Sequence, residues 1–362
     1  MVGVRRFSVS TPQRDYDAVI GRGVLSQVSS FLPPQTGKVF IVTTHDVWRH
    51  HGSALEHLGQ VLFLPGGEQR KRVSGVEALA EQMVEAGGDR SSVVIAFGGG
   101  IVGDMGGFLA ASFMRGIPVI QVPTTLLAQV DAAIGGKTGV NLVAGKNLFG
   151  AFHQPLAVLI DPDVLATLPE REYRAGLQEI IKGGVFRDAA LFDFLEVEHE
   201  RVLALDPEAV ERVIADKVRI KCEVVSADEK EGGLRRILNF GHTIGHALEA
   251  ETGYTRYLHG EAVAFGMVAA TDLAVRVGLL NEAGAARIVD VIRLYKALLP
   301  ADGISAVNLL GRIAKDKKTI QGKVHFVLPT RIGDVKVVSG LDPAVILQSI
   351  EAALKSTKSG AL

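Results

Sequence analysis

The sequence predicts an α/β N-terminal nucleotide-binding domain with a mostly parallel sheet, followed by a mainly α-helical C-terminal domain. Short β-branched runs alternate with helical stretches up to about residue 161, and long amphipathic segments follow. The 362 residues, 47% of them hydrophobic, can bury two cores. We therefore expect domains at residues 1–165 and 166–362.

Each half contains segments with a recognisable period. The expected strands of the N-terminal sheet are residues 38–42, 60–64, 92–97 and 117–122, and Gly or Pro punctuates nearly every end. In the C-terminal half, 209–225 and 282–299 have helical spacing. Residues 323–328 form either a strand or a buried connection, and 342–355 begins with Asp-Pro, as a terminal helix would.

Composition excludes several kinds of partner. Lys and Arg total 39 against 40 Asp and Glu, which argues against nucleic acid or an anionic membrane held by bulk charge. Cys222 is the only cysteine, so no intrachain disulfide can form and a reducing compartment is expected. No apolar signal segment follows Arg5 and Arg6, and Asp272 and Arg276 interrupt the most apolar later stretch. We expect a cytoplasmic protein without a membrane span.

A glycine-rich turn is the first candidate binding motif. Residues 92–97 lead into Gly98-Gly99-Gly100-Ile101-Val102-Gly103-Asp104, which satisfies G-x-G-x-x-G at a strand end. Such glycines let a backbone approach a pyrophosphate, and the next helix offers N–H groups to it. A turn without a ligand is the alternative, because no acidic residue follows about 20 positions later to bind a ribose. The polar turns 65–71 and 123–125 can meet this one at a single sheet edge.

Three histidines suggest a metal centre. His242 and His246 are spaced i,i+4, which places both on one face of a helix, and His259 lies in an expected turn beside Glu261. A borderline metal such as Zn²⁺ takes neutral imidazole and carboxylate ligands. Histidines whose hydrogen bonds are satisfied within the core remain the alternative.

A carboxylate ligand for this centre is expected from Glu179. Glu179 and Lys182 have i,i+3 spacing in an otherwise apolar helical turn, where unpaired charges are costly. A surface ion pair is the alternative, which the apolar neighbours disfavour.

Basic residues also recur in Gly-rich or buried-looking contexts. They are Arg115, Lys137, Lys146, Lys221 and Arg235. Lysine and arginine bind phosphate and carboxylate groups as point charges or as forks. As a set, they suggest a substrate with more than one negative charge.

Taken together, these motifs resemble those of the 3-dehydroquinate synthases, sugar-phosphate cyclases of the shikimate pathway. The similar segments, spread over nearly the whole chain, are residues 98–104, 113–116, 123–125, 131–138, 146–148, 167–169, 179–182, 238–246 and 259–261. The resemblance implies an NAD-binding α/β domain, a helical domain, a cleft between them and a homodimer.

The resemblance also implies roles for individual residues. It makes Glu179, His242 and His259 the ligands of one divalent metal, Zn²⁺ or Co²⁺, and places His246 near the substrate. The catalytic set it implies is His246, Lys137, Lys182, Asn147 and Arg235. The further substrate-binding residues it implies are Asp131, Lys146, Lys221, Asn239, Lys317 and, from the partner subunit, Arg115.

For NAD, the resemblance implies a second set of residues. These are Glu68, Lys71, Gly99, Gly100, Asp104, Thr124, Thr125, Lys137, Lys146 and Thr167. The family usually has Asp-x-Asn where this chain has Thr44-His45-Asp46, and we expect Asp46 to replace one of those contacts with the adenosine ribose.

The family's reaction accounts for these groups. It converts 3-deoxy-D-arabino-heptulosonate 7-phosphate to 3-dehydroquinate and phosphate by transient oxidation with NAD, β-elimination of phosphate, reduction, ring opening and an intramolecular aldol step. The cations would mainly position the substrate.

Three other readings stay open. Another cyclase of the superfamily would share most of the motifs, and retained Asn239 and His246 with the basic set favour dehydroquinate. A metal-dependent polyol dehydrogenase would share the layout, but a neutral polyol needs no such cations. An inactive NAD-binding module is disfavoured, because no proposed catalytic position is visibly lost.

Overall fold

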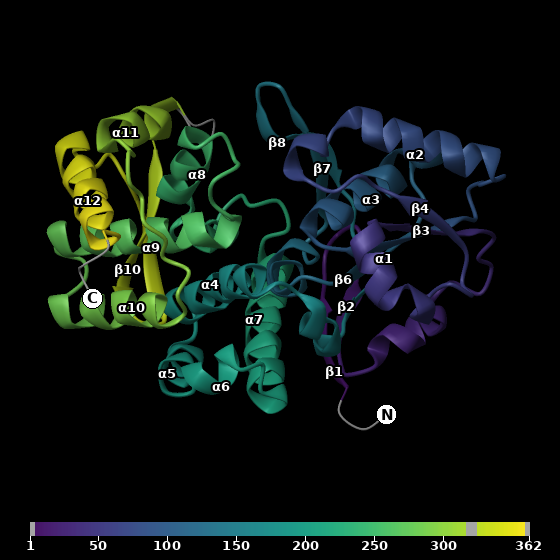
Figure 1. The fold of residues 1–362 in the computed structure, drawn as a ribbon, viewed down its shortest axis with the longest axis horizontal. Coiled ribbons are helices and arrows are strands. Elements are labelled where there is room, and N and C mark those ends of the chain that lie inside the picture. Colours follow the sequence, from purple (N-terminus) through teal and green to yellow (C-terminus); the bar gives the residue numbers. More distant parts are fainter. Residues whose placement is uncertain (1–3, 316–323, 359–362) are drawn as a thin grey trace. The chain divides into compact units, whose positions relative to one another are not determined.

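The computed structural model describes residues 4–315 and 324–358 (Figure 1). They belong to two compact units, of which the first comprises Met1–Pro169 with Lys221–Glu229, and the second Glu170–Ile220 with Lys230–Leu362. Helix α7 (Pro207–Ala227) therefore begins in the second unit and ends in the first.

The first unit is built around a seven-stranded sheet. Its strands are β1 (Arg5–Val9), β2 (Tyr16–Ile20), β3 (Val39–Thr43), β4 (Gln60–Phe63), β5 (Val93–Gly98), β6 (Val119–Pro123) and β9 (Ala157–Ile160). Their order is β1-β2-β9-β6-β5-β3-β4, and only the β1–β2 pair is antiparallel. A separate antiparallel hairpin joins β7 (Lys137–Leu142) to β8 (Gly145–Phe152).

Helices and short turns cover this sheet. They are η1 (Val24–Phe31), α1 (His45–His51), η2 (Gly52–Ala54), η3 (Glu68–Arg70), α2 (Val73–Glu85), α3 (Gly100–Ser112), η4 (Phe113–Arg115), the π-helix η5 (Ala128–Ala132) and η6 (Pro162–Thr167).

Strand β5 shows how the sequence builds two cores from one sheet. Val94 and Ala96 pack with α2 and α3 on one face, whereas Val93, Ile95 and Phe97 pack with η1 and the region of α1 on the other. Successive side chains of a strand point to opposite faces, so a continuous apolar run is what a strand buried on both faces requires. The carboxyl end of β5 then opens onto the Gly-rich turn that begins α3.

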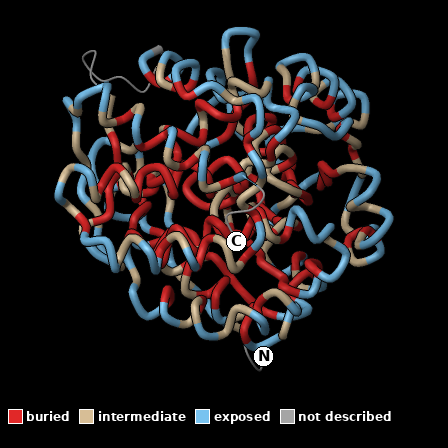
Figure 2. Tube along the Cα trace, turned by 60° about the vertical axis from the view of Figure 1, so that its left-hand side comes forward, coloured by how far each residue is buried: buried red, intermediate tan, exposed pale blue. Residues whose placement is uncertain are grey.

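The second unit is mainly helical. Besides most of α7, its elements are α4 (Glu170–Phe186), α5 (Ala189–Val197), α6 (His199–Leu203), η7 (Leu234–Asn239), α8 (His242–Glu251), α9 (His259–Arg276), α10 (Glu282–Leu294), α11 (Ala306–Lys315), α12 (Pro343–Ser356) and the hairpin of β10 (His325–Arg331) and β11 (Asp334–Ser339). Figure 2 shows buried stretches of the chain in red towards the inside of the trace and exposed stretches in pale blue towards the outside.

The fold class predicted from the sequence is confirmed. Of the run 323–328, residues 325–328 belong to β10 and residue 323 lies outside the described part of the chain. One local expectation is wrong, since His259 is the first residue of α9 and does not lie in a turn. Within the described ranges, no helix is long and apolar enough to cross a membrane.

Candidate metal centre and cofactor site

The candidate metal centre lies within the second unit, where three helices bring a carboxylate and three imidazoles together. Glu179 on α4 is completely buried. Its Oε1 lies 3.7 Å from Nε2 of His242 on α8 and 3.8 Å from Nε2 of His259 on α9. Ligand atoms of a tetrahedral zinc site lie about 3.4 Å apart, as bonds of about 2.0–2.1 Å require. The spacing is therefore close to that of a metal site.

Neighbouring acceptors orient both imidazoles. His242 Nδ1 lies 3.2 Å from the carbonyl oxygen of Phe240, and His259 Nδ1 lies 3.5 Å from Oε2 of the buried Glu249. An imidazole that donates from Nδ1 presents the lone pair of Nε2. Both Nε2 atoms consequently face Glu179.

His246 gives the centre a second possible composition. Ligand nitrogens of His242, His246 and His259 all lie within 4.8 Å of one another, so the three imidazoles could also hold an ion. His246 is one turn beyond His242 on α8, is partly exposed, and has Nε2 4.0 Å from Glu249 Oε2. The two Nε2 atoms that converge on one Glu179 oxygen favour the set with Glu179.

The donor chemistry fits a borderline divalent cation. The set offers imidazole nitrogens and a carboxylate, which Zn²⁺ and similar ions prefer. Both oxygens of Glu179 are buried without a hydrogen bond, although Lys182 Nζ forms an ion pair with Oε2 at 2.5 Å. Burial disfavours protonation of His259, but the facing carboxylates of Glu249 and Glu179 outweigh it and raise its pKa.

Close helix packing sets this geometry. A Cβ atom at Gly266 of α9 would lie 1.9 Å from the carbonyl oxygen of Gly241, next to α8, and one at Gly260 would lie 1.9 Å from that of Ala175 in α4. Only glycine permits these approaches. They bring the first turn of α9, which carries His259, against α4, which carries Glu179.

Other predicted substrate-binding residues occupy distinct places. In the second unit, Lys182 and Arg235 are buried, and Asn239 Nδ2 donates to Glu231 Oε1 at 2.7 Å. In the first unit, Lys221 Nζ donates to Asp131 Oδ1 at 2.7 Å. Asp131 lies on the π-helix η5, a conformation that is frequent at functional sites.

Five predicted cofactor or catalytic residues meet in the first unit. Lys71 is buried and its Nζ donates to Asp104 and, at 2.5 Å, to Oδ1 of Asn147. Lys146 Nζ lies 3.9 Å from Glu68 Oε1. Burial raises the pKa of the Asp104 carboxyl, and the ammonium of Lys71 opposes that shift.

The Gly-rich turn lies at the end of the neighbouring β5. A Cβ at Gly99 would lie 3.0 Å from Cγ2 of Thr125, and the amide of Thr124 donates to the carbonyl of Gly98 at 3.0 Å. No described side chain caps the first turn of α3, which begins at Gly100. This bare, closely approachable helix N-terminus fits a pyrophosphate group.

Three predicted residues lie apart from these clusters, and a fourth cannot be placed among the described residues. Arg115 is exposed at a φ of 70° after α3. Asp46 is exposed on α1, and the hydroxyl of Thr44 lowers the pKa of its carboxyl. Thr167 Oγ1 is 2.8 Å from His51 Nε2. Lys317 lies outside the described residues.

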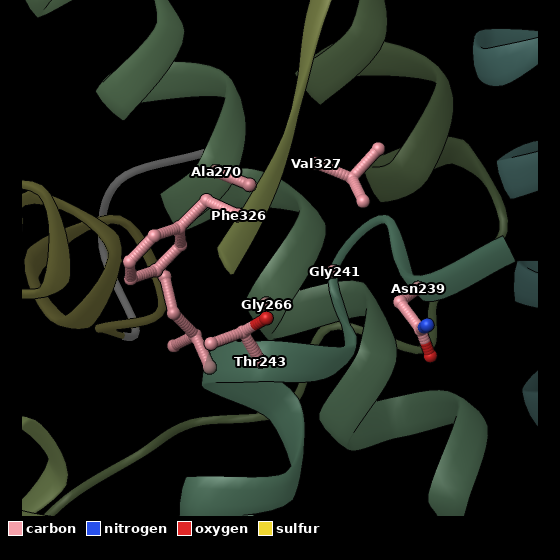
Figure 3. Close-up of a pocket in the computed structure, with 8 residues that line it drawn as sticks. Asn239, Gly241, Thr243, Gly266, Ala270, Phe326 and Val327 are labelled. Carbon is pink, nitrogen blue, oxygen red and sulfur yellow. The ribbon is translucent and has the colours of Figure 1, made fainter. Parts of the chain in front are cut away.

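Two cavities, one in each unit, lie beside the metal and cofactor clusters and do not enclose them. A crevice beside Asn239 and Gly241 is too narrow for a water molecule, and the Asn239 amide points away from Phe326 on its far side (Figure 3). A cleft of about 400 Å³ lies among the end of β4, η3 and α2, and no predicted site residue lines it. Its volume is within the range of ligand pockets.

The sequence reasoning missed several residues that contact predicted ones. Glu249 and Glu231 face His259 and Asn239, but acidic residues in helical or loop segments carry no distinguishing signal. Glu261, for which the sequence indicated no role beyond its place beside His259, accepts from the Leu258 amide and pairs with Arg171 at 2.6 and 2.8 Å. Glu261 therefore fixes the start of α9.

Solved structures share this fold over nearly their whole length. One is 2-epi-5-epi-valiolone synthase from Streptomyces hygroscopicus with NAD⁺ and Zn²⁺ bound, at a TM-score of 0.86, 30% identity, and 96% and 98% coverage of the two chains. Another is 2-deoxy-scyllo-inosose synthase with carbaglucose-6-phosphate, NAD⁺ and Co²⁺. Its TM-score is 0.86 and its sequence identity 27%, and the match covers 96% of this chain and 100% of that chain. The fold and the candidate metal centre thus define a protein of the sugar-phosphate cyclase class.

Sequence comparisons narrow this class. Models of the N-terminal and C-terminal parts of 3-dehydroquinate synthase match residues 61–175 and 176–319. A 3-dehydroquinate synthase of Solibacter usitatus is 60% identical over 353 residues, covering 96% of this chain and 99% of that protein. One of Koribacter versatilis is 48% identical over 358 residues, covering 96% and 98%. The chain belongs to the 3-dehydroquinate synthase family.

Proposed function

We propose that this enzyme converts 3-deoxy-D-arabino-heptulosonate 7-phosphate to 3-dehydroquinate and phosphate, with NAD and one divalent metal as cofactors. The observation that carries the proposal is the convergence of two imidazole Nε2 atoms on the buried carboxylate of Glu179. It occurs in a chain whose full-length relatives are named for this activity.

The cofactors supply the redox and Lewis-acid chemistry. When bound, a divalent metal polarises a substrate hydroxyl and NAD accepts and returns a hydride. Glu179, His242 and His259 hold the metal, and His246, partly exposed beside them, moves a proton at the substrate.

The remaining polar residues bind and orient the two small molecules. Lys182 and Arg235 supply buried positive charge, which suits an acidic substrate. In the first unit, Glu68, Lys71, Asp104 and the turn at Gly99 serve the NAD molecule. Both residue sets serve one reaction.

Other members of the superfamily are the nearest rivals. The structural neighbours at 30% and 27% identity carry the names of cyclases that form other products. The 60% identical relative favours dehydroquinate as the product of this chain. A glycerol dehydrogenase of Schizosaccharomyces pombe, 18% identical with a TM-score of 0.66, shares the fold alone.

A homodimer accounts for an exposed apolar surface in the first unit. The residues are Met114, Leu142, Val143, Leu148, Phe149 and Phe152, all more than a third exposed and mostly on β7–β8. Large apolar side chains exposed together on one hairpin are typical of an interface. Arg115 follows Met114, and both hold a left-handed φ, which supports a role for Arg115 towards a second copy. The buried, lone Cys222 supports a cytoplasmic location.

A direct assay tests the activity. The purified protein is mixed with the heptulosonate phosphate, a catalytic amount of NAD⁺, and Zn²⁺ or Co²⁺. We expect phosphate and 3-dehydroquinate in equal amounts with no net NADH. Accumulating NADH, or no phosphate release with metal present, would contradict the proposal.

A further inference from the structure

Asn141, near the end of β7, makes an unusual set of hydrogen bonds that no predicted role accounts for. The side chain is 7% exposed. Its Nδ2 donates to Oε1 of Glu68 at 2.7 Å and to the Glu68 carbonyl at 3.2 Å, while its Oδ1 accepts from the amide of Asn147 at 2.8 Å. One buried amide therefore satisfies groups 73 residues back and 6 residues ahead in the chain.

The backbone of Asn141 extends the same connection. Its amide donates to the carbonyl of Lys71 at 2.8 Å, and its carbonyl accepts from Nη1 of Arg72 at 3.4 Å. The first residue of η3 and the two residues that follow this turn are thus attached to β7. Two segments distant in sequence, residues 68–72 and the β7–β8 hairpin, are fixed to each other through this residue.

The groups that Asn141 holds are those proposed to bind NAD and the substrate. Lys71 donates to Oδ1 of Asn147, so the two segments also meet side chain to side chain. Glu68 has Lys146 as an ion-pair partner, but at 3.9 Å, which is too long for a hydrogen bond. Of the Lys146 ammonium and the Asn141 side-chain amide, the amide, at 2.7 Å, is the one within hydrogen-bond distance of the Glu68 carboxylate.

Only an asparagine has the right chemistry and length here. Glu68 requires a donor, whereas the amide of Asn147 requires an acceptor, and a primary amide provides both at once. Asn147 has a φ of 52°, in the left-handed region, so the backbone there departs from regular strand geometry. Its N–H donates to the Asn141 side chain. Aspartate could meet only the second requirement, and alanine neither.

We propose that Asn141 is a positioning residue of the cofactor site, which acts by holding the Glu68 carboxylate and the backbone at Asn147 in one fixed arrangement. This inference rests on the proposed function, because it takes Glu68, Lys71 and Asn147 as part of the NAD and substrate sites. It predicts that Asn141 governs cofactor affinity without touching the cofactor.

The test measures the dissociation constant of NAD⁺ by calorimetry on the full chain, with thermal melting to follow folding. We expect Asn141→Ala to weaken NAD⁺ binding about tenfold, since a hydrogen bond to a charged group is lost. Asn141→Asp should weaken it further, because it places a second carboxylate against Glu68. Asn281→Asp, at the N-cap of α10 in the second unit, is the matched control and should bind NAD⁺ like the unaltered protein.

A paired exchange separates positioning from general stability. In the double variant Asn141→Asp with Glu68→Gln, donor and acceptor change places and the hydrogen bond can re-form. Because Glu68 itself is proposed to serve NAD⁺, the reference for the double variant is Glu68→Gln alone. We expect Asn141→Asp to weaken NAD⁺ binding less in the Glu68→Gln background than in the unaltered protein, at an unchanged melting temperature. An equal loss of affinity in both backgrounds overturns the proposal, and this comparison stands even if Asn141→Ala does not fold.

Glu68→Ala distinguishes this inference from the proposed site. If Glu68→Ala weakens NAD⁺ binding and a folded Asn141→Ala stays within about twofold of the unaltered protein, the positioning role is wrong and the site stands. If Glu68→Ala also leaves binding unchanged, Glu68 does not belong to the cofactor site and the inference falls with it.

Discussion

At the scale of single residues, Glu179 is a fully buried carboxylate in the helix α4. A fully buried carboxylate is costly unless cations or hydrogen bonds compensate for it. Lys182 Nζ meets one oxygen at 2.5 Å, while His242 and His259 face the other. Lys182 already neutralises part of the negative charge of Glu179. A metal cation bound by His242 and His259 would stabilise the same carboxylate further.

The ligand set predicts different metal contents for neighbouring histidine variants. We expect His259→Ala and Glu179→Gln to lose bound metal, because each removes a proposed ligand. His246→Ala should keep the metal but slow turnover about a hundredfold or more, as loss of a proton-transfer group does. Metal analysis of the purified proteins checks the metal contents, and the phosphate-release assay checks the turnover. Equal metal loss in His246→Ala would point instead to the three-histidine set.

Lys182→Met tests the buried ion pair. Removing one partner leaves Glu179 uncompensated, so the free energy of unfolding of the metal-free protein should fall by about 3–5 kcal/mol. Added Zn²⁺ should raise the melting temperature of this variant more than that of the unaltered protein, because the ion replaces the lost charge. Equal rises in the two proteins would contradict this reading.

At the scale of elements, the approach of α8 to α9 determines whether the histidines can meet. Gly266→Ala would place a Cβ 1.9 Å from the Gly241 carbonyl. We expect it to cost at least about 1–3 kcal/mol of stability, the range for overpacking, and to weaken metal binding. Gly311→Ala is the matched control, because no described atom lies within 4 Å of a Cβ at that position in α11. A gain of up to about 1 kcal/mol is expected there. Denaturant unfolding and metal titration measure both; unchanged metal affinity in Gly266→Ala would refute the packing argument.

The end of β8 provides a pH-dependent contact. His153 Nε2 lies 2.8 Å from the Ile117 carbonyl, to which it donates when neutral, and burial lowers its pKa below 6.5. The folded state therefore favours the neutral form of His153. The stability that the neutral imidazole contributes is present in full above pH 6.5 and is lost as the pH falls through the lower folded-state pKa. His153→Gln keeps a donor but does not titrate. Its melting temperature should fall less than that of the unaltered protein between about pH 7.5 and about pH 5.5; an equal fall would show that His153 is not responsible.

At the scale of the whole molecule, the exposed apolar surface on the β7–β8 hairpin predicts self-association. Leu148 and Phe152 are four residues apart in β8 and share one face. We expect Leu148→Glu with Phe152→Glu to convert a dimer into monomers in light scattering. Val307→Glu, whose side chain is 65% exposed on α11, is the control and should leave the assembly unchanged. A native protein that is already monomeric would refute the dimer.

Much of this molecule could be predicted from local patterns. The runs that became β3, β5 and β6 are buried on both faces of the sheet, and their short length, β-branched content and flanking Gly or Pro identify them as strands. The family and the activity class are confirmed as well, since they follow from motifs that stay contiguous in the sequence. The residue assignments within the site stay predictions.

The contacts made by Asn141, Glu249 and Glu261 could not be predicted. Each is a common polar residue in an ordinary helix or strand, and its partner lies on another element or in a distant turn. Local propensity says nothing about such partners. The start of α9 was missed for a similar reason, because a tertiary ion pair between Glu261 and Arg171 anchors a helix start that the flanking glycine had suggested to be a turn.

By itself, the sequence determined the two-part fold class, the family and the pool of polar side chains, because periodicity and short motifs are local properties of the chain. Only the tertiary structure decided which of those side chains meet. His242 and His246 looked like a pair from their spacing, yet both His242 and His259 turn Nε2 towards Glu179. Helix spacing fixes which residues share a face, whereas the carboxylate that completes the centre comes from a different helix, and packing around glycines brings it within reach.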